Sequence, residues 1–110
     1  MALRVRVCTL DEIVPNQLRG FHVQGVTWPV MVTRVGDLLF AFPGVCPHDD
    51  VSLVDYGLLD ANAPSGPEVT CRVHGYRFDL TNGRCEHVPQ LHLRRYKVTI
   101  VDSDLWVDLL

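Results

Sequence analysis

The sequence lacks the features that mark several large classes of protein. No stretch of it approaches the roughly 18 consecutive apolar residues that span a bilayer, and residues 1–7 alternate apolar and charged side chains, unlike the apolar core of a signal peptide. Basic residues do not cluster beyond Arg94-Arg95 and the nearby Lys97, in a chain whose net charge is −3, so no nucleic-acid partner is expected. We therefore expect a cytoplasmic protein that binds neither membranes nor nucleic acids.

Motifs that carry catalysis are missing as well. The sequence has no Gly-rich phosphate loop, no nicotinamide or flavin motif and no recognisable Ser-His-Asp set. It also has no internal repeat and no low-complexity segment. We expect residues 1–110 to form a single domain that turns over no substrate on its own.

What the sequence does contain is a pair of cysteines that each have a histidine close behind them. Cys46-Pro47-His48 forms the first motif and Cys71-Arg72-Val73-His74 the second, with 22 residues between His48 and Cys71. In a cytosolic domain, cysteines at such spacing indicate metal or redox chemistry before structural disulfides.

The mixed ligand types of these motifs favour one kind of iron–sulfur centre. In some [2Fe–2S] centres two Cys hold one iron and two His hold the other. The sequence therefore predicts Cys46, His48, Cys71 and His74 as the ligands of one such cluster, which would join two hairpins. A Cys₂His₂ zinc-binding module is the alternative, but zinc sites usually group the two Cys together and the two His together.

Apolar residues recur mostly with period two, which is typical of strands with one buried face. Such strands are predicted over 3–7, 18–23, 29–35, 38–42, 78–80, 84–86, 96–101 and 105–109. Thr9 and Glu12 form a capping box at the start of one helical turn. Gly36-Asp37, Asn82-Gly83 and residues 102–104 are expected to form turns, with Asn82-Gly83 suited to type I′. The predicted fold is all-β, an antiparallel sandwich or small barrel, with 60–67 as a surface loop.

The two motifs, set in an all-β chain of this length, resemble those of the Rieske-type ferredoxins. The resemblance covers nearly the whole chain, since Gly83, Pro89, Leu93, Tyr96 and Trp106-Val107 also fit the family's usual layout. It implies a two-loop cluster-binding subdomain over about 43–85. It also implies that the chain carries single electrons from an NAD(P)H-dependent flavin reductase to a terminal oxygenase, in systems such as aromatic-ring dioxygenases and toluene-type monooxygenases. A monomer is expected. The spacing between the motifs is a few residues longer than usual, which fits an insertion at 61–67.

Four positions favour a low-potential member of this family. High-potential Rieske proteins carry an extra Cys in each loop, where this sequence has Val51 and Val73. They also direct a Ser and a Tyr hydroxyl to the cluster sulfurs, where this sequence has Tyr76 and Phe78. Fewer hydrogen bonds to sulfur lower the potential. The alternative within this fold is the Rieske-like small subunit of a nitrite-reductase-type enzyme, several of which lack the ligands that are present here.

The remaining Cys and His residues are not expected to bind metal. Cys8 fits the first strand as a small buried hydrophobe, and Cys85 is interpreted in the same way, although the sequence leaves its exposure open. His22, His87 and His92 have no Cys at ligand spacing. We expect His48 and His74 at the tip of the protein, beside the acidic pair Asp49-Asp50, which is either a solvated turn or a patch that steers a basic partner.

Overall fold

The computed structural model describes residues 3–109, which form eleven strands, one short α-helix and one 3₁₀ turn, η1. The elements are β1 (Arg4–Thr9), η1 (Leu10–Glu12), β2 (Arg19–Phe21), β3 (Val30–Val35), β4 (Leu38–Pro43), β5 (Val45–Cys46), β6 (Val51–Ser52), α1 (Leu53–Tyr56), β7 (Gly57–Asp60), β8 (Glu68–Cys71), β9 (Tyr76–Asp79), β10 (Lys97–Val101) and β11 (Asp104–Asp108). The predicted all-β class is confirmed, and every strand-to-strand pairing is antiparallel.

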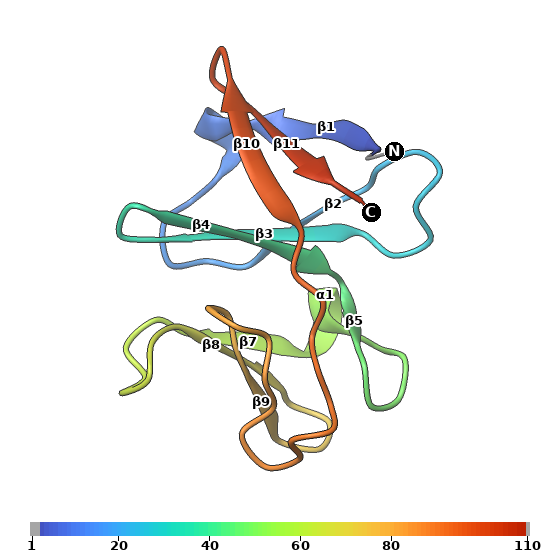
Figure 1. The fold of residues 1–110 in the computed structure, drawn as a ribbon, viewed down its shortest axis with the longest axis vertical. Helices are drawn as coiled ribbons and strands as arrows, with labels where there is room; N and C mark the ends of the chain where they lie inside the picture. Colours follow the sequence, from blue (N-terminus) through green and yellow to red (C-terminus); the bar gives the residue numbers. More distant parts are fainter. Residues whose placement is uncertain (1–2, 110) are drawn as a thin grey trace.

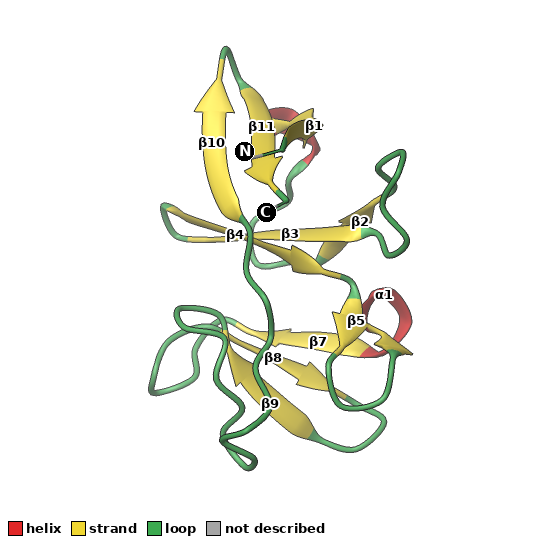
Figure 2. Ribbon diagram, turned by 45° about the vertical axis from the view of Figure 1, so that its right-hand side comes forward, coloured by secondary structure: helices red, strands yellow, loops and turns green. Residues whose placement is uncertain are grey.

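Three sheets are stacked one above another (Figures 1 and 2). The sheet β1-β11-β10 lies at the top of the view, β2-β3-β4 in the middle and β7-β8-β9 at the bottom, with the small β5-β6 hairpin and α1 beside the bottom sheet. From β9 the chain returns to β10 through one long connection that runs up the molecule in this view.

The middle sheet has both faces buried, which explains why β3 is buried at four successive positions. Val30 and Val32 pack with the top sheet, whereas Met31 and Phe42 join the core that surrounds Cys46 and Cys71. Neighbouring residues of a strand point to opposite faces. The β3–β4 hairpin therefore contributes side chains to both cores and forms the wall that separates them. This wall holds the lower part of the molecule, which carries both motifs.

The hairpins show where local sequence rules hold. Val35 pairs with Leu38 around Gly36, whose φ is 60°, as predicted for this turn. At 82–83 the expected type I′ turn is wrong: Gly83 has a φ of 80°, but Asn82 is not left-handed. Instead, the Gly83 N–H donates to the Asp79 carbonyl at 2.6 Å, and Asn82 Oδ1 accepts from the Arg84 N–H at 2.8 Å. The predicted strand at 84–86 is therefore reduced to two isolated bridges, Phe78 with Cys85 and Arg84 with His92.

Other expectations are confirmed or extended. The Thr9 N–H donates to Glu12 Oε2 at 2.8 Å, which completes the capping box at η1. Residues 61–67 form the predicted loop, which connects β7 to β8. The structure adds five elements that the sequence analysis missed, namely β5, β6, α1, β7 and β8. Within residues 3–109 no helix is long and apolar enough to cross a membrane.

Candidate cluster-binding site

The first motif occupies the turn of the β5–β6 hairpin. Cys46 is the last residue of β5 and pairs with Val51 across a loop of residues 47–50. Pro47 fixes the backbone directly after the cysteine, and Asp50 adopts a left-handed conformation with a φ of 45°. The loop is further tied to the rest of the chain because the Leu53 N–H donates to the Gly44 carbonyl at 2.9 Å.

The second motif has the same construction. Cys71 is the last residue of β8 and pairs with Tyr76 across a loop of residues 72–75. Gly75 has a φ of 77° and donates its N–H to the Cys71 carbonyl at 2.8 Å, so the loop closes in a sharp turn at this glycine. Two hairpins thus each present a Cys at the end of a strand and a His within a four-residue loop.

The two loops bring the four predicted residues together. The Cys46 Sγ and His48 Nδ1 atoms lie 2.8 Å apart, and the donor atoms of Cys46, His48 and Cys71 all lie within 4.8 Å of one another. His48 Nε2 lies 2.5 Å from His74 Nδ1, which connects the second loop to the first. Within residues 3–109 these are the side chains that combine thiol and imidazole donors in one place.

Burial separates the sulfurs from the nitrogens. Cys46 and Cys71 are fully buried at 0% exposure, His48 is half-buried, and His74 is exposed. Burial raises the pKa of the Cys46 thiol to about 11, despite a hydrogen bond from the His48 backbone, and Cys71 beside it adds to the increase. A bound cation would be needed to keep such a thiol deprotonated. The site is therefore built with its sulfurs inside and its imidazoles toward solvent.

The donor set fits a [2Fe–2S] cluster with mixed ligands. Two buried thiols on one side and two imidazoles on the other match the division in which one iron takes two Cys and the other takes two His. The four cysteines of the described residues are all free. Val51 and Val73, at the positions of the extra cysteines of high-potential relatives, allow no disulfide.

Two residues that the sequence places near the ligands make contacts that the sequence did not specify. The Tyr76 ring meets the His48 ring edge-on, with centroids 4.6 Å apart and an interplanar angle of 73°. The Asp49 carboxylate has an oxygen within 4.8 Å of donor nitrogens of both His48 and His74. The position of Asp49 next to His48 in the sequence was the one available signal.

The other cysteines lie inside the protein. Cys8 is 1% exposed in the upper core, where burial raises its pKa to about 11. Cys85 is 4% exposed and belongs to the lower core with Cys46 and Phe78, so its predicted burial is confirmed.

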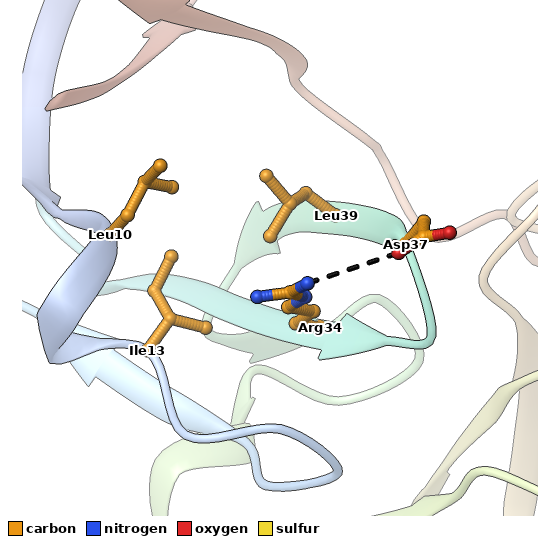
Figure 3. Close-up of a pocket in the computed structure, with 5 residues that line it drawn as sticks. All are labelled: Leu10, Ile13, Arg34, Asp37 and Leu39. Carbon is orange, nitrogen blue, oxygen red and sulfur yellow. Dashed lines mark ion pairs between the residues drawn. The ribbon is translucent and has the colours of Figure 1, made fainter. Parts of the chain in front are cut away.

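A separate cavity of about 180 Å³ lies far from this chemistry, between η1 and the β3–β4 hairpin (Figure 3). Leu10, Ile13 and Leu39 line it together with Arg34, whose guanidinium lies 3.9 Å from Asp37 and donates to the Gly36 carbonyl at 2.9 Å. The cation is thus already engaged, and the cavity offers no group for metal or redox chemistry.

Comparison with known proteins identifies the family. The profile described as Rieske [2Fe-2S] domain matches residues 4–97. The ferredoxin of carbazole 1,9a-dioxygenase from Nocardioides aromaticivorans IC177 is 33% identical, with a TM-score of 0.77 over 94% of this chain and 95% of that one. The chain belongs to the Rieske [2Fe–2S] family.

Further Rieske relatives come from oxygenase systems. The ferredoxin component of the p-cumate 2,3-dioxygenase system of Pseudomonas putida is 28% identical over 96% of this chain and 85% of its own length. A solved complex of reduced oxygenase and oxidised ferredoxin in carbazole 1,9a-dioxygenase contains a chain that is 26% identical, with a TM-score of 0.78 over 96% of this chain and 92% of that one.

The Rieske fold is also shared by a Mycobacterium tuberculosis protein whose structure is described as that of a putative NADH-dependent nitrite reductase small subunit. It has a TM-score of 0.83 over 100% of this chain and 97% of that one, at 17% identity. At that identity the likeness concerns the fold alone.

Proposed function

We propose that Cys46, His48, Cys71 and His74 bind one [2Fe–2S] cluster and that the chain carries single electrons to a terminal oxygenase, in aromatic-compound oxidation. The observation that carries this proposal is the convergence of the two loops, with two buried thiols behind two outward imidazoles. The cluster, when bound, supplies a one-electron redox couple. The proposed donor of the electrons is an NAD(P)H-dependent flavin reductase.

The ligand types set the direction of the potential. Two ferric ions, two sulfides and two thiolates sum to zero charge, whereas four thiolates would leave two negative charges, so a site with two imidazoles accepts an electron more readily. Within the Rieske range we propose a low potential. Val51 and Val73 form no disulfide, and Phe78 has no hydroxyl to donate to a sulfur.

His48 and His74 are the proposed point of electron exit. Both side chains reach the surface, and a partner that docks there would come close to the imidazole-bound iron. The residues around them belong to the two hairpins. The docking face is proposed to include Pro47, Asp49, Asp50 and Val51 from the first, and Val73, Gly75 and Tyr76 from the second.

The family relatives support this role over the alternatives. Ferredoxin components of dioxygenase systems match the chain along nearly its whole length. A nitrite reductase small subunit that lacks the ligands differs from this chain, which has all four. A Cys₂His₂ zinc module would be colourless, whereas an iron–sulfur protein absorbs visible light.

The proposed functional unit is the whole of residues 1–110, with the cluster-binding part over about 43–85. It is proposed to work as a monomer in the cytoplasm. The core of residues 43–85 also includes Met31 and Phe42 of the middle sheet. If 43–85 were excised, the apolar side chains that pack against β3 and β4 would be exposed to solvent.

Reduction kinetics with a flavin reductase and an oxygenase test this function. The exposed pair Asp49-Asp50 lies beside His48, so we expect Asp49→Asn/Asp50→Asn to slow association and to flatten its salt dependence. A matched control is Asp11→Asn/Asp102→Asn, which changes the net charge equally at exposed sites remote from the loops. The midpoint potential of each variant is measured in parallel, because Asp49 lies near the ligands. A wild-type protein that takes no electron from any reductase, or passes none to an oxygenase, would contradict the proposal.

A further inference from the structure

Helix α1 places apolar side chains on the surface directly beside both ligand loops. It directly follows β6, the second strand of the first hairpin, and only Leu53 of its four residues is buried. Val54 and Tyr56 are each 47% exposed, and Val73 of the second loop is 43% exposed. In a helix successive residues are rotated by about 100°, so with Leu53 inside, Val54 and Tyr56 lie on the two flanks of the helix.

Hydrogen bonds fix α1 against the second ligand loop. The Arg72 N–H donates to the Tyr56 carbonyl at 2.8 Å, and the Arg72 guanidinium donates to the Asp55 carbonyl at 2.8 Å. Gly57, the residue after Tyr56, is the cross-strand partner of Cys71. Tyr56 is thus hydrogen-bonded to Arg72, and Val73 is the residue after Arg72. Both therefore lie at the second ligand loop, close in the chain or across the strands to Cys71.

The other flank of the helix is anchored as well. A Val54 methyl group lies only 3.0 Å from the position that a Cβ on Gly20 would occupy, so Val54 packs on the bare backbone of β2. The Val54 side chain and the Tyr56 backbone are therefore held in place before any partner arrives, which reduces the entropy lost on binding.

Exposure alone does not distinguish these residues, because Leu38 and Val101 are 55% and 45% exposed at other places on the surface. The setting of α1 does distinguish them. The two ligand loops and α1 carry three exposed carboxylates, on Asp49, Asp50 and Asp55, and one cation, Arg72. Apolar side chains within an acidic rim form a surface that fits a partner with an apolar patch and basic residues around it.

We propose that Tyr56 and Val73, together with Val54 on the opposite flank of α1, form an apolar shoulder through which the chain binds its terminal oxygenase, next to the histidine tip that passes the electron. This proposal rests on the proposed function. The oxygenase is favoured over the reductase because a related ferredoxin has been captured in a complex with its oxygenase, and because the shoulder continues the face that would dock there.

The shoulder and the acidic pair Asp49-Asp50 are then expected to affect different rate constants of binding. Charges at the rim act mainly on the rate of association and weaken with salt. Buried apolar contacts act mainly on the rate of dissociation and are insensitive to moderate salt. Tyrosine is among the residues that most often dominate an interface, so Tyr56 is expected to matter most.

Binding of the cluster-loaded chain to oxygenase from a candidate partner system tests the shoulder. We expect Tyr56→Ser to weaken Kd about tenfold and Val54→Ser by less, through faster dissociation, at low and at high salt. The visible spectrum and the midpoint potential should stay at their wild-type values. The matched controls Leu38→Ser and Val101→Ser remove equally exposed side chains elsewhere and should change Kd less than about twofold.

The outcomes separate the shoulder from the proposed function. If the wild-type chain binds the oxygenase and both shoulder variants bind it with the same Kd, the role of the shoulder is refuted and the proposed function is not. Weakened binding to the reductase, with oxygenase binding intact, would also overturn it. A wild-type chain that binds no oxygenase would overturn the shoulder and the proposed function together.

Discussion

At the scale of single residues, the four cysteines are all buried, so Cys8 and Cys85 serve as controls for substitutions at the proposed ligands Cys46 and Cys71. Cys46→Ser and Cys71→Ser should lose the cluster and its colour, whereas Cys8→Ser and Cys85→Ser should retain two irons and two labile sulfides per chain. The reason is position, since only Cys46 and Cys71 lie with His48 and His74. Loss of the cluster should also lower the melting temperature, because the cluster joins two hairpins. Retained colour in Cys71→Ser, measured with iron and sulfide analysis, would contradict the ligand assignment.

Phe78 allows a test of the low-potential assignment. Its ring is fully buried in the core that contains Cys46 and Cys71. We expect a wild-type midpoint near the low end of the Rieske range, about −150 mV, and a higher value in Phe78→Tyr, where a new hydroxyl can donate to a sulfur. Phe42→Tyr adds the same hydroxyl to the same core from the middle sheet and serves as the control. A wild-type midpoint near +300 mV would refute the assignment.

The sequence predicted the four proposed ligand residues and the acidic pair beside them, but not the contacts between their side chains. A Cys with a His two or three residues later is a short local motif, and such motifs can be recognised from the sequence alone. The contact of Tyr76 with His48 and the proximity of Asp49 to both imidazoles depend on how two loops approach each other. Nothing in the spacing of the motifs specifies that approach.

At the scale of elements, the long β7–β8 loop lies at the end of its hairpin away from the ligands. Gly57 pairs with Cys71 at the ligand end, and Asp60 pairs with Glu68 at the loop end. Replacement of residues 61–66 by Asn-Gly, with Pro67 kept because its carbonyl accepts from the Leu80 N–H, should leave the visible spectrum and midpoint unchanged. A shifted potential in the shortened variant would mean that the loop reaches the site.

Glu68 at that loop end provides a prediction about pH. It is 7% exposed, and burial, followed by repulsion from Glu86, raises the pKa of its carboxyl. A raised carboxyl pKa makes the folded state more stable as pH falls through that pKa and less stable at neutral pH. Glu68→Gln should therefore melt about 2 °C higher at pH 7, a few tenths of a kcal/mol, and this gain should vanish near pH 4. Asp102→Asn is the exposed control, and an equal gain at both pH values would contradict the stated cause.

Elements were predictable where one face is buried and a regular turn follows. The outer strands, the Gly36 hairpin and the capping box follow from alternation and turn chemistry. The strands β5 and β6 have two residues each and α1 has four, which is too short for a hydrophobic period to develop. They are stabilised by packing around Leu53 and by the hairpin loops, and these are tertiary effects.

At the scale of the whole molecule, the β3–β4 wall separates the core of the top sheet from the core that carries the proposed cluster ligands. Its upper face closes a core that contains Cys8, and its lower face supports the core beneath the ligand loops. The arrangement leaves the histidines at one end of the chain's surface, where a partner can reach them. Stability and electron transfer are thus assigned to different cores that share one hairpin.

The central claim is that two histidines of this chain bind one iron of a single [2Fe–2S] cluster. Nitrogen hyperfine spectroscopy on the reduced protein, with only the histidines labelled with ¹⁵N, measures this directly. We expect two strongly coupled histidine nitrogens, and the loss of this two-nitrogen pattern in His48→Ala and His74→Ala but not in His22→Ala. A signal with one coupled nitrogen or none, or a colourless protein that contains zinc, would contradict it.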